Sequence, residues 1–311
     1  MNHLSNWAKN VLLWALDLSK RNYYVARAYY QYIHRREQKK FKGPPLIIFQ
    51  MGKVGSQTVH RSLKALNLDM PIYHSHLLTR ERIAETENKR KKFFRTERQP
   101  YLNRPWLNRF LRNQIDKGLN SKKWKVITLT RDPVARNIST FFENLEFKTI
   151  DASQKFEIIS DYYDIPATLI NLDDLEKLKA LFLERMNHNS PLEFFERELK
   201  GVFGIDIYKS AFPRYVGYKI YKDKIADVLV IRLETLNECA QKAFKEFLDI
   251  DNFSLIVENV SADKIYADLY QRFKDNIVLP NSYIDKLYNS KYMRHFYSEE
   301  EINALSEKWF K

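Results

Sequence analysis

An apolar run that leads directly into a glycine-flanked lysine limits, more than any other feature, how this chain can fold. Residues 46–49 read Leu-Ile-Ile-Phe, and Gln-Met-Gly-Lys-Val-Gly-Ser-Gln-Thr-Val follows at 50–59. This order predicts a buried strand, a tight turn, and a helix from about Ser56 to Ala65. Units of this kind build sheets in which strands and helices alternate along the chain.

The same order recurs further along the chain. Val-Ile-Thr-Leu-Thr at 126–130 is the clearest buried strand, and Arg131-Asp132-Pro133 ends it. Pro133 suits the first turn of a helix with Asp132 as its N-cap, and this helix is predicted to reach about Glu146. We therefore predict an α/β fold, with a parallel sheet and crossover helices on both faces. The other predicted strands are 71–74, 215–221 and 228–233, and the other predicted helices are 80–99 (an exposed helix or lid), 106–117, 171–200 with a break at 187–191, 234–248 and 261–310.

Gly43-Pro44-Pro45 separates a basic N-terminal segment from the first strand. We therefore expect a helical N-terminal extension, residues 1–42, and a main domain, residues 43–311. Residues 4–37 fit a basic amphipathic helix that either packs on the domain or rests on an anionic membrane surface. Its apolar block, 11–16, is far shorter than the roughly 20 residues that cross a bilayer. The apolar stripe of this helix consists of Leu4, Trp7, Val11, Leu12, Trp14 and Leu18.

Charge and cysteine content limit the function. The chain has 52 Lys and Arg against 39 Asp and Glu, a net charge of +13, which predicts an anionic partner without choosing among nucleic acid, lipid and acidic small molecules or polymers. A single cysteine, Cys239, excludes an internal disulfide framework and a cysteine zinc cluster. The expected location is the cytoplasm, with peripheral contact at the inner membrane face as a further option.

The turn after the first strand has the chemistry of an oxyanion site. Gly52 and Gly55 let the backbone close around an oxyanion, Lys53 supplies a full charge, and the helix N-terminus adds partial positive charge. Further hydrogen-bond donors are Ser56, Gln57 and Thr58. A nucleotide hydrolase needs four residues between its glycines, followed by Lys-Ser/Thr. Here the lysine lies between the glycines, which disfavours metal-assisted phosphoryl transfer, and no metal is expected.

The turn after the 126–130 strand predicts a second oxyanion site. Arg131 places a guanidinium at the strand end, and Ser139 places a hydroxyl two helical turns further on. Because the carboxyl ends of parallel strands meet at one edge of a sheet, the two sites suit a ligand that is phosphorylated at two places.

Together, these two stretches resemble the cofactor motifs of sulfotransferases that use 3′-phosphoadenosine-5′-phosphosulfate (PAPS). The stretches are Gly-Lys-Val-Gly-Ser-Gln-Thr at 52–58 and Thr-Leu-Thr-Arg-Asp-Pro-Val-Ala-Arg-Asn-Ile-Ser-Thr-Phe-Phe at 128–142. The resemblance implies a P-loop-like sulfotransferase fold. It also implies that Lys53 contacts the bridging oxygen of the phosphosulfate and that the backbone amides of the first motif, including that of Val54, hold its phosphate. Arg131 and Ser139 would hold the 3′-phosphate.

Within this superfamily the chain most resembles bacterial capsular polysaccharide synthesis proteins, over most of residues 46–310. The stretches 201–208, 217–236 and 290–309 add to that resemblance. Many cytosolic sulfotransferases also carry a C-terminal Arg-Lys-Gly that grips the 3′-phosphate, and this sequence has none. Lys291 or Arg294 is the candidate replacement.

A histidine pair follows the predicted strand at 71–74. His-Ser-His at 74–76 resembles the His-x-His of uronyl 2-O-sulfotransferases, which implies that His76 is the catalytic base and that His74 orients or binds the substrate. Glu143 and Glu146 are the next candidates for the base. Two histidines without a third ligand nearby do not make a zinc site.

The resemblance implies transfer of a sulfuryl group from PAPS to a hydroxyl of a glycan, a capsular or other cell-surface polysaccharide or a glycolipid, with adenosine 3′,5′-bisphosphate as the other product. The basic stretches at 80–98 and 104–123 either line an acceptor groove or are solvated faces. No nucleic-acid-binding signature is present, so no nucleic-acid partner is expected. The alternatives are a P-loop-like small-molecule kinase and a non-catalytic polyanion-binding protein.

Overall fold

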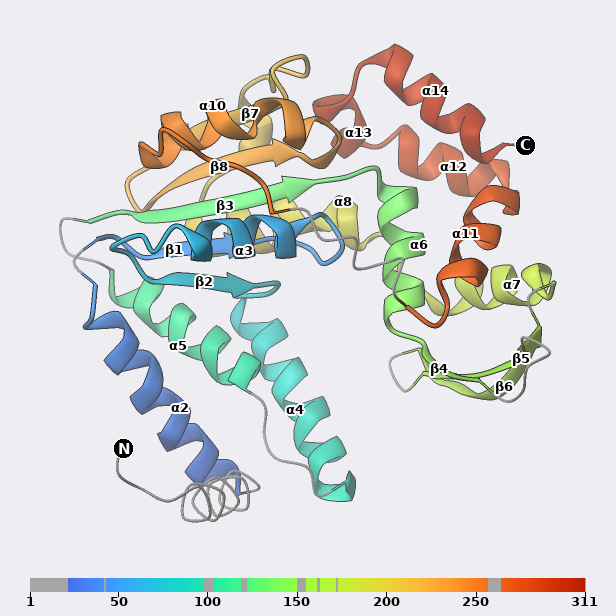
Figure 1. Ribbon diagram of the computed structural model, residues 1–311, viewed down its shortest axis with the longest axis horizontal. Helices are drawn as coiled ribbons and strands as arrows, with labels where there is room; N and C mark the ends of the chain where they lie inside the picture. The colour runs from blue at the N-terminus through green and yellow to red at the C-terminus, as the bar shows by residue number, and fades with distance from the viewer. Residues whose placement is uncertain are drawn as a thin grey trace.

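Five strands form the central sheet in the computed structural model of the protein (Figure 1). Four neighbouring strands are parallel, as predicted, and the edge strand β7 runs antiparallel to β8. In their order across the sheet, the strands are β2 (Ile72–Ser75), β1 (Leu46–Phe49), β3 (Trp124–Thr130), β8 (Ala226–Arg232) and β7 (Tyr218–Lys222). The structure describes residues 22–41, 43–97, 103–118, 122–149, 155–160, 163–171, 173–256 and 264–310.

Helices lie on both faces of this sheet, which confirms the mixed α/β class. In Figure 1, α3 (Ser56–Ala65) and α10 (Leu236–Leu248) lie in front of the sheet, and α8 (Ser190–Phe194) lies behind it. The other helices are α2 (Tyr23–Gln38), α4 (Arg80–Glu97), α5 (Asn103–Lys117), α6 (Pro133–Glu143), α7 (Leu175–Arg185), α9 (Gly201–Phe203), α11 (Ala267–Asn276), α12 (Asn281–Tyr288), α13 (Lys291–Phe296) and α14 (Glu299–Trp309). A π-helix, η1 (Phe195–Lys200), continues α8, and η2 (Ile207–Lys209) and η3 (Leu233–Thr235) are 3₁₀-helices.

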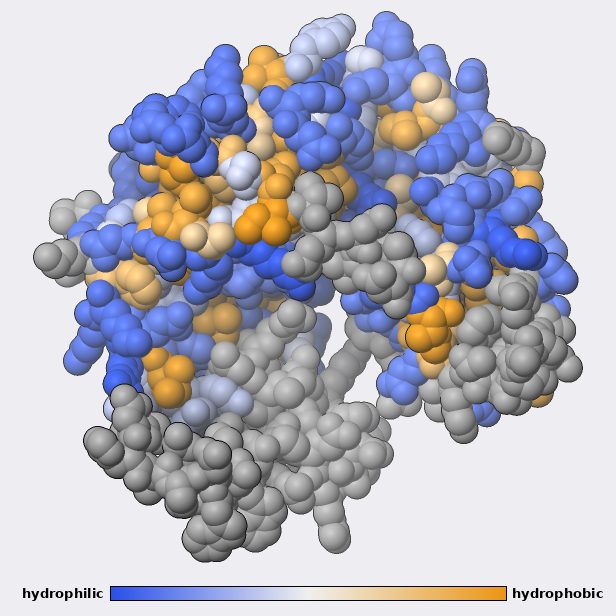
Figure 2. Space-filling model, viewed as in Figure 1, coloured by the Kyte–Doolittle hydropathy of each residue, from blue (hydrophilic) through white to orange (hydrophobic). Residues whose placement is uncertain are grey.

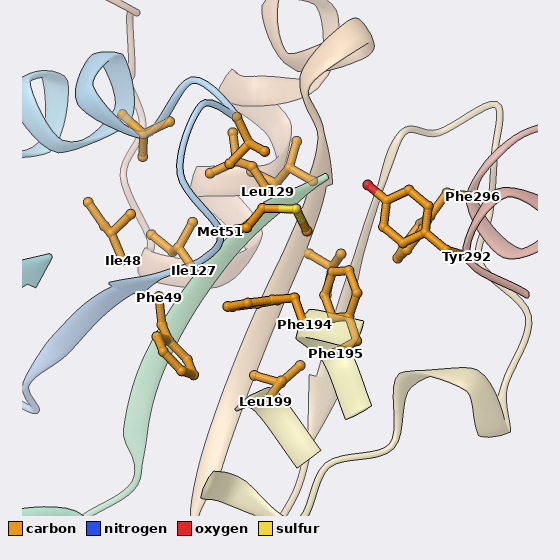
Figure 3. Close-up of a cluster of buried hydrophobic side chains, with 14 of the residues drawn as sticks. Ile48, Phe49, Met51, Ile127, Leu129, Phe194, Phe195, Leu199, Tyr292 and Phe296 are labelled. Carbon is orange, nitrogen blue, oxygen red and sulfur yellow. The ribbon is translucent and has the colours of Figure 1, made fainter. Parts of the chain in front are cut away.

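Aromatic side chains fix the helices to the carboxyl edge of the sheet (Figure 3). Because side chains alternate along a strand, Phe49 points to the opposite face from Ile48, and its ring lies 5.3 Å from that of Phe194. Phe195 in turn lies 5.3 Å from Phe296 of α13. All four side chains are buried, so the segment 190–200 and the C-terminal helices share one core with the sheet.

A second, antiparallel sheet lies beyond α6 and was not predicted. Its strands are β4 (Glu146–Thr149), β5 (Lys155–Ser160) and β6 (Ile165–Asn171), paired in that order. The helix predicted to reach Glu146 ends at Glu143 instead, with Asn144 as its C-cap. The strands show only short alternations of apolar and polar residues, and a register shift between Ile158 and Ser160 interrupts the pattern further. Too little period-2 signal remains to predict strands here.

Other differences concern the boundaries of elements. The strand predicted at 215–221 begins only at Tyr218, because residues 214–216 form a turn. The predicted helical region 171–200 begins with the end of β6, and its break at 187–191 separates α7 from α8. The C-terminal region is helical from Ala267 onward, in agreement with the prediction.

The described part of the N-terminal extension packs on the domain. Helix α2 buries Ala26 and His34, and the rings of His34 and Phe110 of α5 lie 5.3 Å apart. The predicted stripe from Leu4 to Leu18 lies outside the described residues. Within the described part of the chain, no helix is both long enough and apolar enough to span a bilayer.

Candidate functional site

The two predicted anion loops leave adjacent parallel strands at the same edge of the sheet. Strands β1 and β3 pair in register, with Ile48 opposite Ile127, and each runs directly into its motif. Strand β2 lies on one side of β1 and strand β3 on the other, so the chain reverses its direction of travel across the sheet between them. Such a switch point is where open α/β sheets bind ligands, at the carboxyl ends of the strands.

Side chains of the second motif bond to the backbone of the first. The Arg131 guanidinium donates to the Lys53 carbonyl at 2.9 Å, and Arg136 Nε donates to the Gly52 carbonyl at 3.1 Å. The two motifs therefore form one continuous surface. Arg136 was missed by the sequence analysis, although an arginine among the apolar residues of the predicted helix is a recognisable signal. It is 6 % exposed, so its charge is held inside the site.

The first loop has the backbone of an anion-binding concavity. Lys53 has φ 68° and Gly55 has φ 83°, whereas Val54 between them does not have a positive φ. This alternation turns successive N–H groups toward one point. The first N–H groups of a helix have no intrahelical acceptor, and the N-cap of α3, Gly55, has no side chain that could accept from them. In Figure 2 the surface is hollowed between the region of β2 and the region of α6, on the side where β1 and β2 end.

The predicted donors of this loop differ in exposure. Gln57 is exposed, and Gly52 and Thr58 are half-buried. Val54 is fully buried and Ser56 is 5 % exposed. The exposed fraction of Val54 includes its backbone, so its amide is not open to solvent in this structure, and the contact that the resemblance implies stays a prediction.

Lys53 points at Glu143, the last residue of α6. Its Nζ lies 3.4 Å from Glu143 Oε2, and the same oxygen accepts hydrogen bonds from Lys264 Nζ and from the Tyr266 hydroxyl at 3.2 Å. Burial lowers the pKa of the Lys53 ammonium below its ordinary value, while the Glu143 carboxylate opposes that shift. Two ammonium groups thus share one carboxylate. Lys264 and Tyr266 were missed, since they lie more than a hundred residues from Glu143 in sequence.

Glu143 suits this pairing better than the role of a base. Burial alone would raise the pKa of its carboxyl, but the hydrogen bond from Lys264 and the charge of Lys53 outweigh burial and lower it. A carboxylate stabilised as an anion takes up a proton weakly. Glu146, the other alternative base, is exposed and opens strand β4 of the second sheet.

Hydrogen bonds from two C-terminal tyrosines hold the turn at Arg131. The Tyr292 hydroxyl accepts from the Arg131 amide at 3.0 Å and donates to the Arg131 carbonyl at 2.8 Å. The Tyr288 hydroxyl donates to Asp132 at 2.8 Å, and Asp132 caps α6 through the amides of residues 134 and 135. Glu234 accepts from the Asp132 amide at 2.8 Å. Burial raises the pKa values of Asp132 and of Glu234.

Ser139 lies on the same helix as Arg136. A spacing of three residues places them on one side of α6, and Arg136 already reaches the first loop. Ser139 is half-buried. Its position is therefore compatible with the ligand contact that the resemblance implies.

The histidine pair lies beside the first loop. His76 Nδ1 is 2.9 Å from the Gln50 carbonyl. Because a carbonyl only accepts, Nδ1 carries the hydrogen, and in the neutral ring the lone pair is on Nε2. The rings of His74 and His76 lie 4.7 Å apart, and that of His60 of α3 lies 5.5 Å from His74. Among the residues that the structure describes, no three metal-ligand side chains converge as in a metal site.

Glu198 fixes the chain just after His76 and was missed by the sequence analysis. Its fully buried carboxylate accepts from the amides of Leu78 at 2.8 Å and Thr79 at 3.1 Å, and Arg82 Nη1 lies 3.2 Å away. It comes from the π-helix, more than a hundred residues away in sequence, so no local pattern could reveal it. We infer that Glu198 positions the loop that carries the histidines.

The remaining candidates have other surroundings. Lys291 pairs with Glu196 at 2.9 Å. Arg294 lines a cavity next to residues 211–215. In the two basic stretches, described arginines form internal ion pairs, Arg109 with Glu87 and Arg112 with Asp116. These ion pairs partly neutralise the charge of the two stretches. They favour solvated faces over an acceptor groove.

The fold and this site define a class: an open, mostly parallel α/β protein with basic loops at the switch point of its sheet. A family model described as "Putative capsular polysaccharide synthesis protein" matches residues 169–298. The match covers Glu198, Glu234, Tyr288 and Tyr292, which support the site, but not the two loops themselves. No curated protein and no solved structure matches the chain.

Proposed function

We propose that the protein is a PAPS-dependent sulfotransferase that acts on a hydroxyl of a glycan, a capsular or other cell-surface polysaccharide or a glycolipid. The observation that carries this proposal is the hydrogen bond from Arg131 to the Lys53 carbonyl, because it joins the two loops at the switch point. One doubly phosphorylated nucleotide can then reach both. The family match at 169–298 supports a carbohydrate acceptor.

The residues divide the chemistry as follows. His76 Nε2 takes the proton of the acceptor hydroxyl, whose oxygen attacks the sulfur as the bond from sulfur to the bridging oxygen breaks. The electron pair stays on that oxygen, where the Lys53 ammonium and the amides of 52–58 stabilise the charge. Arg131 and Ser139 hold the 3′-phosphate. The Gln50 carbonyl keeps His76 in the tautomer that this step needs.

Glu143 holds the Lys53 ammonium when no ligand is bound. An incoming phosphosulfate replaces it, and Lys264 remains beside the released carboxylate. No step uses a metal ion.

The membrane contact of the N-terminal extension and the cytoplasmic location stay predictions of the sequence.

The test is transfer of labelled sulfate from PAPS to cell-surface polysaccharide of the producing organism. We expect His76→Ala to lower the transfer rate by about a hundredfold or more while the affinity for adenosine 3′,5′-bisphosphate is unchanged. Lys53→Ala and Arg131→Ala should weaken that affinity as well. Normal turnover by His76→Ala would assign the base elsewhere, and absence of bisphosphate binding by the unmodified protein would overturn the proposal.

A further inference from the structure

A cavity of about 400 Å³ lies apart from the two loops. It opens between the turn at residues 211–215 and the end of α13, where Arg294 and His295 lie. Strand β7 begins just after this turn, and its Tyr218 pairs with Ile231 near the end of β8. The cavity is therefore at the carboxyl edge of the same sheet, but on the β8–β7 side instead of at the β1–β3 switch point.

The turn that walls the cavity is held in place by hydrogen bonds. The Pro213 carbonyl accepts from the amides of Val216 at 3.0 Å and Gly217 at 3.1 Å. Gly217 has φ 80°, and a Cβ there would lie 2.1 Å from the Thr235 hydroxyl oxygen. Lys219 Nζ donates to the Ala211 carbonyl at 2.5 Å. This ordered turn presents Tyr215 with 95 % of its surface exposed, so an aromatic face stands open beside the cavity.

Two guanidinium groups supply the charge of the cavity. Arg214 donates to the carbonyls of Arg294 and His295 and so joins the turn to α13. Arg294 is exposed, and no residue that the structure describes forms an ion pair or hydrogen bond with its guanidinium. The nearby carboxylates are already paired, Asp206 with Lys200 and Glu196 with Lys291. Glu300 and Glu301 interact electrostatically with Arg214 and offset part of its charge. The charge that no described carboxylate pairs with is therefore that of Arg294.

His295 lines the cavity with an uncharged polar side chain. Burial, together with the charges of Lys219 and Arg214, lowers the pKa of its imidazole to about 4. Its ring packs 4.9 Å from that of Tyr208. Of the side chains that line the cavity, the arginines therefore carry the positive charge at neutral pH, and their planar fork matches a carboxylate.

We propose that this cavity binds a carboxylate-bearing sugar unit of an acidic polysaccharide. Arg294 pairs with the carboxylate, and the ring of Tyr215 packs on the apolar face of the sugar. The volume falls within the range of pockets for small ligands. A sugar fits better than a nucleotide because all the lining residues lie inside 169–298, the segment that matches the capsular polysaccharide synthesis family. The inference rests on the glycan part of the proposed function and not on PAPS.

The test is calorimetric titration with trigalacturonate, a short acidic oligosaccharide, and with its uncharged methyl ester. We expect Arg294→Gln and Tyr215→Ala each to weaken trigalacturonate binding by about tenfold or more, the value of a charged hydrogen bond or a buried ring face. The methyl ester should bind the unmodified protein about as weakly as trigalacturonate binds these variants. Arg214 is left unchanged because its guanidinium joins the turn to α13.

The controls separate this inference from the proposed function. Lys53→Ala should bind trigalacturonate like the unmodified protein, and Tyr215→Ala should bind adenosine 3′,5′-bisphosphate like the unmodified protein. Equal affinity of Arg294→Gln and the unmodified protein for trigalacturonate would overturn the inference. The inference would also be overturned if a single-stranded oligonucleotide of equal charge bound more tightly than trigalacturonate and if its binding depended on Arg294. If trigalacturonate binds but the bisphosphate does not, the proposed function alone fails.

Discussion

Lys53 combines three properties that rarely occur in one residue. It is a non-glycine residue with φ 68°, its carbonyl accepts the Arg131 guanidinium, and its ammonium faces Glu143. A left-handed backbone costs a residue with a Cβ about 1–2 kcal/mol, and such strain often marks functional sites. The strained residue thus brings an ammonium and the Arg131 guanidinium to the same loop.

Glu143→Gln tests whether the carboxylate only holds Lys53. We expect this variant to bind adenosine 3′,5′-bisphosphate about twofold to fivefold more tightly, because the partly exposed ion pair between Lys53 and Glu143 no longer has to break. Sulfuryl transfer should persist. Calorimetry measures the affinity for the bisphosphate, and the transfer assay measures the rate of sulfuryl transfer.

Glu146→Gln is the matched control, since Glu146 is exposed at the start of β4, and it should leave both quantities unchanged. A loss of transfer of about a hundredfold in Glu143→Gln, with binding retained, would instead make Glu143 the catalytic base.

At the residue scale, short motifs carried the predictions. Gly52, Lys53 and Arg131 were singled out because each lies just past an apolar strand, and their role in binding stays a prediction. The sequence could not indicate Glu198 or Tyr292, because both reach the site from more than a hundred residues away. Nor could it show the tautomer of His76, which depends on a single carbonyl of the neighbouring strand end.

Helices α12 and α13 act as a support for the second loop. Tyr288 from α12 bonds to Asp132, and Tyr292 from α13 makes two hydrogen bonds to the backbone of Arg131. Figure 3 shows Tyr292 beside Phe195 and Phe296, so the phenol is anchored in the core while its hydroxyl reaches the loop. The C-terminal elements thus fix the direction in which Arg131 leaves β3.

Tyr292→Phe tests that support. Removing the hydroxyl leaves the amide and carbonyl of Arg131 without this partner, so we expect a loss of about 1–3 kcal/mol in the free energy of unfolding. Binding of adenosine 3′,5′-bisphosphate should weaken severalfold, because Arg131 is held less firmly. Urea unfolding and calorimetry are the measurements.

Tyr163→Phe is the comparison, since that hydroxyl donates to the Thr140 carbonyl at 3.2 Å, towards the other end of α6 from Arg131. It should lower stability and leave binding nearly unchanged. Unaltered binding by Tyr292→Phe would show that the C-terminal helices contribute to stability alone.

At the element scale, prediction succeeded where burial on both faces makes a strand a continuous apolar run. Strands β1, β3 and β8 are such runs, and all three were predicted close to their observed positions. The sheet β4–β6 was missed because its strands have short alternations and an irregular register. The π-helix η1 was also missed, since its extra residue per turn leaves no distinct sequence signal.

At the scale of the whole molecule, the order of the strands places both proposed binding regions on one edge of the sheet. The switch point lies between β1 and β3, and the cavity lies beside the β8–β7 end. An acidic polysaccharide that spans both regions would present one of its hydroxyls at the first. The net charge of +13 agrees with two anionic ligands on one protein.

The most direct measurement compares three nucleotides by calorimetry: adenosine 3′,5′-bisphosphate, adenosine 5′-monophosphate and adenosine 3′-monophosphate. We expect the unmodified protein to prefer the bisphosphate by about tenfold or more over each monophosphate, and over ATP with Mg²⁺. In Lys53→Ala the 5′-phosphate should add little affinity, and in Arg131→Ala the 3′-phosphate should add little. If each phosphate adds the same affinity in all three proteins, the two loops do not hold opposite ends of one ligand.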